Sequence, residues 1–146
     1  MAIALLLALL NTANAAPSES YFDAGVTLGY PGGFNATGAY WRGQLGARGT
    51  LGYGGYSSGA QLTGLYRFGE VRPMRASHSV GITTGHTEIA GNHSTYLAAV
   101  YEMDLRRGFY LQTGLGLAQK ANQPVQALIS MGYVRRFHPK VAPEPG

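Results

Sequence analysis

The chain has no cysteine, which excludes disulfides, thiolate metal sites and cysteine nucleophiles. Charged residues make up only 12% of its 146 residues, about half the share found in a typical soluble domain. Lysine occurs only at Lys120 and Lys140, so the formal net charge of +4 comes almost wholly from arginine. These basic residues are scattered, which argues against a nucleic-acid-binding protein. No segment after the first 15 residues is apolar for the roughly 20 residues that a membrane-spanning helix needs.

Residues 1–15 have the form of a secretory signal peptide. Residues 3–10 are apolar, and Ala13-Asn14-Ala15 has the small-x-small pattern of a cleavage site. We therefore predict cleavage after Ala15. No basic residue precedes the apolar stretch, so either the amino terminus supplies the charge or the start lies inside a longer signal. An uncleaved membrane anchor is the alternative, but the apolar stretch is short for that role.

Glycine and tyrosine are abundant, with 22 and 10 copies, and both favour strands and tight turns. Apolar residues alternate with small or polar ones, for example at Leu97, Ala99, Tyr101 and Met103. Alternating side chains point to opposite faces of a strand, so each segment has one apolar face. We predict an all-β, eight-stranded, antiparallel up-and-down transmembrane β-barrel over residues 16–137, followed by a proline-rich tail, 138–146. The predicted strands are residues 21–30, 34–41, 45–53, 60–68, 78–85, 95–105, 109–118 and 125–137.

An even number of strands returns both ends of the chain to one side of a membrane, the periplasmic side for an exported chain. The connections near Arg42, at 69–77 and at 106–107 would then be periplasmic, and most arginines lie near them. The outer loops would be 31–33, 54–59, 87–94 and 119–124, which are short and nearly uncharged.

The chain resembles the small eight-stranded outer-membrane proteins, a class that includes the OmpA transmembrane domain and the OmpX and OmpW groups. The resemblance covers about residues 21–137 and rests on the alternation, the Tyr- and Gly-rich strands and an aromatic end to the last strand. Residues 130–137 look like the signal read by the barrel-assembly machinery, with Gly132 and Phe137 matching it. The resemblance implies a monomer in the bacterial outer membrane, in contact with lipid. The short outer loops differ from those of OmpX-like adhesion proteins.

Side-chain parity places six charged residues inside the predicted barrel, where a buried charge needs a partner. We expect an interior network of ion pairs that fills and orders the lumen, because pores usually need more strands. A narrow or gated ion path is the alternative, since several interior glycines leave room. The predicted network comprises Asp23, Arg48, Arg67, Glu102, Asp104 and Arg136.

His86, Glu88 and His93, with Ser94, lie in and beside one predicted outer loop and are the candidate metal ligands. Lipid A deacylases of this size carry His-x-Ser on one strand face. Here His93 and Ser94 are adjacent and point to opposite faces, so that motif is absent. A polar loop is the simpler interpretation, and we expect no enzyme activity, no metal and no cofactor.

Aromatic residues gather near the predicted strand ends, where tyrosine and tryptophan favour the lipid headgroup level. The expected girdle includes Tyr21, Phe22, Tyr30, Phe34, Tyr40, Trp41, Tyr53, Tyr66, Phe68, Tyr101, Phe109, Tyr133 and Phe137. Three functions stay open: a structural outer-membrane barrel with weak pore activity at most, an exported soluble barrel that binds a small apolar ligand, and a lipid-modifying outer-membrane enzyme. The face that carries the apolar residues distinguishes the first two.

Overall fold

The fold is known from a computed structural model, which describes residues 20–71, 76–105, 108–119 and 124–137, with only the backbone at 69–71. The predicted signal segment, 1–15, and the predicted tail, 138–146, lie outside this part of the chain. The described residues form no helix long and apolar enough to cross a membrane. They form eight strands: β1 (Ser20–Gly29), β2 (Gly33–Arg42), β3 (Leu45–Tyr53), β4 (Ser57–Val71), β5 (Ala76–Ile89), β6 (Asn92–Leu105), β7 (Phe109–Gln119) and β8 (Val125–Phe137).

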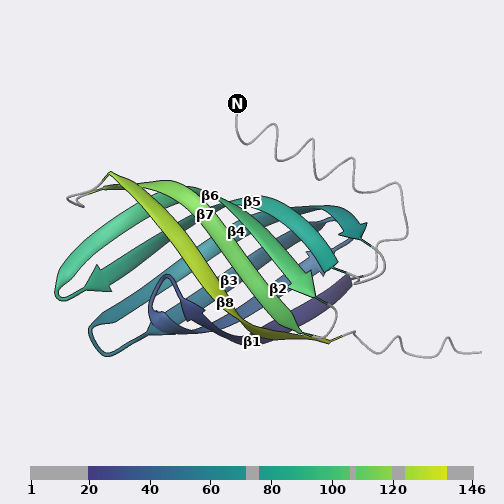
Figure 1. The fold of residues 1–146 in the computed structure, drawn as a ribbon, viewed down its shortest axis with the longest axis horizontal. Coiled ribbons are helices and arrows are strands. Elements are labelled where there is room, and N and C mark those ends of the chain that lie inside the picture. Colours follow the sequence, from purple (N-terminus) through teal and green to yellow (C-terminus); the bar gives the residue numbers. More distant parts are fainter. Residues whose placement is uncertain (1–19, 72–75, 106–107, 120–123, 138–146) are drawn as a thin grey trace, which may run out of the picture.

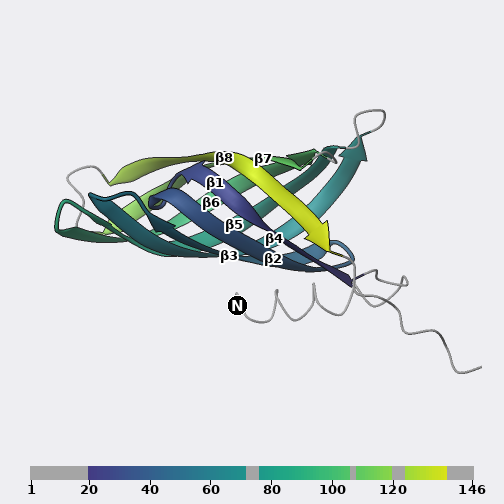
Figure 2. The ribbon, with the colours of Figure 1, turned by 90° about the horizontal axis from the view of Figure 1, so that it is seen from below.

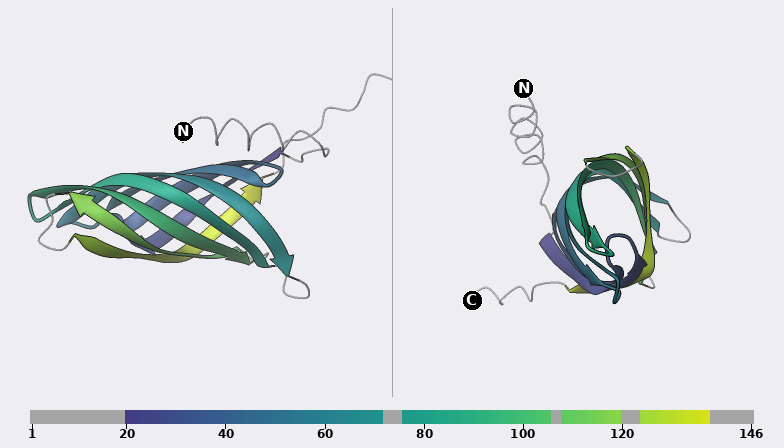
Figure 3. Two further views of the ribbon diagram at one scale, coloured as in Figure 1. Left: turned by 90° about the horizontal axis from the view of Figure 1, so that it is seen from above. Right: turned by 90° about the vertical axis from the view of Figure 1, so that its left-hand side faces the viewer.

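The strands close into one antiparallel up-and-down barrel in which each pairs with its sequence neighbours. β1 pairs with β8 as well as with β2, so the sheet has no free edge. The strands cross the long axis at a slant (Figures 1 and 2), and the view along that axis shows a complete ring (Figure 3, right). This confirms the prediction of an all-β, eight-stranded antiparallel up-and-down barrel. We call the mouth holding Ser20 and Phe137 the terminal end, and the opposite mouth the loop end.

Three strands, β4, β5 and β6, are at least three residues longer than the sequence predicts. β4 begins at Ser57 and ends at Val71, so it takes in part of the predicted loop at 54–59 and of the predicted connection at 69–77. β5 and β6 pair from Ala76↔Leu105 to Ile89↔Asn92, so the predicted loop at 87–94 is wrong. The two strands are joined by Ala90 and Gly91, whose φ angles are +49° and +81°. Positive φ at both central residues is the mark of a type I′ hairpin turn, which fits the twist of paired strands. This hairpin carries His86, Glu88 and His93 on strands instead of in a loop.

The outer face of the barrel is apolar and the inner face is polar. Every strand places a large apolar side chain outward, 47–69% exposed: Val26, Phe34, Leu51, Leu62, Ile82, Leu97, Leu115 and Ile129. Every strand also places a polar side chain inward, at most 5% exposed: Thr27, Asn35, Arg48, Gln61, Thr83, Glu102, Gln112 and Ser130. This arrangement is the reverse of a soluble barrel with an apolar interior.

Two glycines allow the backbones of β1 and β8, the first and last strands, to approach each other closely. A Cβ at Gly25 of β1 would lie 1.9 Å from the carbonyl oxygen of Tyr133, and a Cβ at Gly132 of β8 would lie 2.1 Å from that of Val26. Both distances are shorter than any real contact, so only glycine fits without movement of the backbone. The β1–β8 pairing that closes the barrel, called the seam below, therefore depends on residues without side chains.

Candidate functional site

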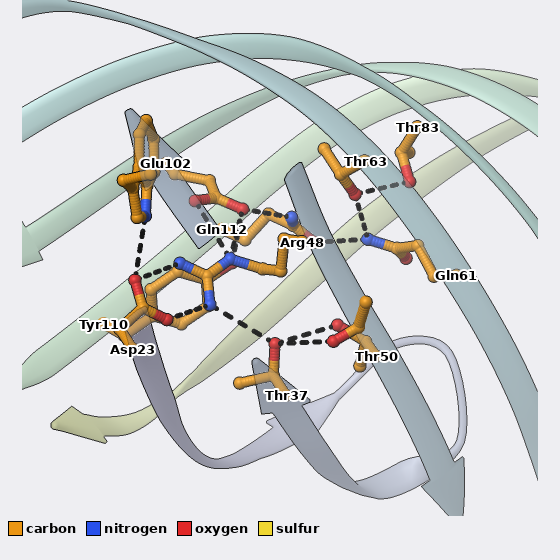
Figure 4. A network of polar contacts seen from close by, with 12 residues as sticks. Asp23, Thr37, Arg48, Thr50, Gln61, Thr63, Thr83, Glu102, Tyr110 and Gln112 are labelled. Atoms are coloured by element: carbon orange, nitrogen blue, oxygen red, sulfur yellow. Dashed lines mark hydrogen bonds and ion pairs between the residues drawn. The ribbon is translucent and has the colours of Figure 1, made fainter. Parts of the chain in front are cut away.

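The centre of the lumen holds a buried ion triad built across the barrel. Arg48 projects from β3 between Asp23 of β1 and Glu102 of β6 (Figure 4). Its Nη1 and Nη2 donate to the two oxygens of Asp23 at 2.8 and 3.2 Å, and its Nε donates to Glu102 Oε1 at 3.1 Å. The three side chains are 1–3% exposed. Because β3 and β6 are not neighbours in the sheet, the triad joins separate parts of the wall.

Neutral donors complete the coordination of the two carboxylates. Two carboxylates against one guanidinium leave a formal charge of −1, and a buried charge is tolerated only when its hydrogen bonds are made. Trp41 Nε1 donates to Asp23 Oδ2 at 2.9 Å. Tyr110 Oη and Gln112 Nε2 donate to Glu102 Oε1 at 2.7 and 2.8 Å. The Tyr110 ring also lies 4.6 Å from Arg48 Cζ, in a cation–π contact.

The hydrogen bonds continue from this triad toward the loop end. Gln112 accepts a bond from Gln61 Nε2 at 3.0 Å, and Gln61 Oε1 accepts one from Tyr96 Oη at 2.8 Å. Gln61 Nε2 also donates to Thr63, which in turn donates to Thr83 at 2.8 Å (Figure 4). The interior polar groups therefore form a chain along the lumen, a continuity that side-chain parity alone does not establish.

The loop end is narrowed by the turn after β1, which curls into the mouth of the barrel (Figure 3, right). Pro31 and Gly32 are buried there. Asn35, fully buried, accepts a bond from Gly32 N at 3.0 Å and donates to the carbonyl of Gly29 at 3.2 Å. The ring of Tyr30 meets that of Tyr96 edge-on, with centroids 5.0 Å apart. The turn thus joins the interior network.

At the terminal end, aromatic rings and guanidinium groups stack. Trp41 is 1% exposed, and Arg67 Cζ lies 4.0 Å from the centroid of its ring. Arg136 Cζ lies 4.6 Å above the Tyr21 ring and pairs with Asp104 at 3.3 Å. The stack lies between the ion triad and this mouth, since Trp41 also bonds Asp23. The lumen is therefore occupied at three levels: the stack, the triad and the Tyr30–Tyr96 pair.

The six predicted network residues separate into two ion-paired groups and one cation. Asp23, Arg48 and Glu102 form the triad, whereas Asp104 and Arg136 form a pair nearer the mouth. Among the described side chains Arg67 has no acidic partner and stacks on Trp41 instead. The parity of charged residues predicts carboxylate partners for each arginine but gives no sign of cation–π partners. The alternation in β2 could have found Trp41, because it continues the inward series Asn35, Thr37 and Ala39.

Two other expectations about the interior need correction. Tyr21, Tyr30 and Trp41 were assigned to the girdle at the rim, but Tyr21 and Trp41 are buried in the lumen and Tyr30 packs there against Tyr96. The interior glycines were expected to leave room for water. A Cβ at Gly85 would lie 2.3 Å from Tyr96 Oη, and one at Gly116 would lie 2.4 Å from the Cβ of Ala98. At these positions the space beside the glycine is already filled by its neighbours.

The candidate metal ligands lie on the outer face near the loop end. His93 is directly opposite Glu88 in the register, and His86 is diagonal to His93. In the described part of the chain, no group of three or more His, Asp or Glu side chains is already arranged to hold a metal ion. His78 lies near the other end of β5 and bonds Tyr101.

Searches among protein-family models, curated proteins and solved structures found no match to this chain.

Proposed function

We propose that this protein is a non-enzymatic β-barrel of the bacterial outer membrane with a structural, membrane-integrity role. Its outer face would contact lipid, and its lumen would be a closed plug and not a pore. The observation that carries the proposal is the reversed sidedness of the barrel, with apolar side chains outward and a hydrogen-bonded ionic interior. In water such an exterior would expose an apolar patch far larger than soluble monomers carry.

The alternative of a soluble ligand carrier is disfavoured by the same observation. A barrel that binds a small apolar molecule needs an apolar cavity with few polar groups. Here the middle of the lumen holds Arg48, Asp23 and Glu102, whose bonds would have to break to admit such a ligand. The retained carboxylates would then be buried without partners.

Cell fractionation and a detergent gel test the proposal. The protein is expected in the outer-membrane fraction, with a band that shifts on boiling because a closed barrel resists the detergent. Recovery in the soluble periplasmic fraction with no shift would contradict it and favour the ligand carrier.

A substitution on the outer face tests lipid contact directly. Leu97 is 59% exposed in the middle of β6, and Leu97→Arg would place a charge in the lipid at a cost of about 2–4 kcal/mol. We expect little assembled barrel. Tyr56→Arg is the matched control, because Tyr56 lies in the β3–β4 turn and is 88% exposed. Normal assembly of both variants would show that the face around Leu97 does not contact lipid.

Single-channel recording distinguishes the plug from the narrow pore. The purified protein in a planar lipid bilayer is expected to pass no steady current, since the stack, the triad and the Tyr30–Tyr96 pair all occupy the lumen. A reproducible conductance of the unmodified protein would establish the narrow path instead.

A further inference from the structure

The outer face near the loop end carries two imidazoles whose nitrogens face each other. His86 Nε2 lies 3.2 Å from His93 Nδ1, and the two rings are stacked at an angle of 21° with centroids 5.4 Å apart. Glu88 Oε2 lies 3.8 Å from the same His93 nitrogen. The three side chains come from facing positions of β5 and β6, which the tight Ala90–Gly91 turn holds in register.

One of the proton arrangements that satisfy these contacts leaves a lone pair on His86. Thr95 Oγ1 lies 3.3 Å from His86 Nδ1, and in this arrangement the hydroxyl oxygen accepts the proton of Nδ1–H. His86 Nε2 is then a bare lone pair that accepts a bond from His93 Nδ1–H. In this arrangement His86 presents the lone pair that a metal-binding imidazole needs, with Thr95 as the outer-shell partner of its other nitrogen.

The spacing of the two nitrogens matches that of ligands on one metal ion. Zinc–nitrogen bonds are about 2.0–2.1 Å long, so two nitrogens at a tetrahedral angle are about 3.3–3.4 Å apart. The observed 3.2 Å lies within about 0.2 Å of this separation. A metal ion would replace the proton that His93 donates, and each ring would turn so that its nitrogen lone pair points at the ion, which lies off the line between the two nitrogens. The carboxylate of Glu88 is within the reach of a side-chain rotation and supplies negative charge.

We propose that His86 and His93, with Glu88 as a third ligand, form a surface site for a divalent transition metal ion of the imidazole-preferring class, Zn²⁺ or Cu²⁺. Two imidazoles and one carboxylate suit these ions, whereas Mg²⁺ prefers oxygen ligands alone. His93 and Glu88 are 61% and 45% exposed, so the ion can enter directly from solvent. The site does not depend on the proposed membrane role, because it needs only the β5–β6 hairpin.

Zn²⁺ titration by calorimetry tests the site on the folded, detergent-solubilised full barrel, purified without a histidine tag. One Zn²⁺ per chain is expected, with Mg²⁺ giving no signal. Loss of one imidazole in His86→Ala or His93→Ala should weaken the affinity at least about tenfold, since even outer-shell changes cost that much. Glu88→Gln should weaken it by a smaller factor. The heat-dependent gel shift checks that each variant is folded.

Two further histidines provide the controls, His78 on β5 and His138 in the sequence beyond the described residues. His78→Ala and His138→Ala should bind Zn²⁺ as the unmodified protein does. Cu²⁺ paramagnetic resonance should show coupling to two imidazole nitrogens, reduced to one in His86→Ala. No Zn²⁺ binding, or equal binding in the folded His86→Ala and His93→Ala variants, would overturn the proposal. Unchanged affinity in Glu88→Gln would remove the carboxylate from it.

Discussion

Arg48 and Glu102 face each other across the lumen, 3.1 Å apart, from strands that are not neighbours in the sheet. The backbone hydrogen bonds of a barrel run only between adjacent strands, so this pair adds a cross-link that the sheet lacks. Asp23 holds the other side of the same guanidinium, which makes Arg48 the common partner of two buried acids. The interior should therefore contribute to stability as one unit.

Removal of Arg48 should destabilise the barrel strongly. Arg48→Met keeps similar length but leaves Asp23 and Glu102 without their cation, and breaking a buried ion pair costs about 3–5 kcal/mol. Urea unfolding in lipid vesicles can be followed by the fluorescence of Trp41, the single tryptophan, which lies beside Asp23. Arg135→Met is the control: Arg135 is exposed, and its removal should cost less than about 0.5 kcal/mol. Equal effects of the two substitutions would contradict a structural role for the triad.

Loss of the Tyr110 hydroxyl alone, with the ring kept, should lower the free energy of unfolding. Tyr110→Phe removes the 2.7 Å hydrogen bond to Glu102 and keeps the ring against Arg48. A bond to a charged acceptor contributes about 1.5–3 kcal/mol, and the unfolding free energy should fall by that amount. Tyr133→Phe makes the same change on an outward ring, 55% exposed, and should be close to neutral. If both variants unfold at the same urea concentration, Glu102 does not depend on this donor.

Gly132 offers a test of barrel closure. Gly132→Ala would place a methyl group 2.1 Å from the carbonyl oxygen of Val26 and should prevent the β1–β8 seam from closing. Gly49→Ala is the matched control, because nothing lies within 4 Å of the Cβ position there. The heat-dependent gel shift should be lost in the first variant and kept in the second. Refolding of purified Gly132→Ala without the assembly machinery separates packing from the recognition that the sequence resemblance implies: normal refolding would show that packing at Gly132 does not limit closure.

The β5–β6 turn holds a residue, Ala90, whose replacement should raise the free energy of unfolding. Ala90 has a φ of +49°, a left-handed conformation that costs non-glycine residues roughly 1–2 kcal/mol, although asparagine adopts it more readily. Asn-Gly is the preferred pair for a type I′ turn, so Ala90→Asn should raise the unfolding free energy by about 0.5–1 kcal/mol. Gly91→Ala, at φ +81°, should lower it. Destabilisation by Ala90→Asn would show that the turn differs from type I′.

The alternation of side chains was enough to predict the barrel because its strands repeat one simple pattern, apolar outward and polar or small inward. β3 and β8 begin and end where the sequence indicated. The tight turn of the β5–β6 hairpin was missed because it is Ala-Gly, a weaker signal than Asn-Gly, and because the polar residues next to it are also typical of a loop. The charged residues of the triad followed from parity. Their links to Gln61 and Tyr96 did not, because contacts across a lumen depend on the stagger of strands that are far apart in sequence.

The pairing of β1 with β8 has a consequence for how the chain is organised. Phe22 and Phe137 are partners in the register, so the two ends of the barrel sequence lie side by side at one mouth. In the closed ring β1 and β8 pair as the other neighbouring strands do. Their pairing differs from the other seven only in that no connecting segment joins the two strands. A circular permutant joined there by a short linker and opened at Ala90–Gly91 would keep all eight strand pairings. It would, however, begin with β6 and end with β5, so His93 and His86 would lie near opposite ends of the chain.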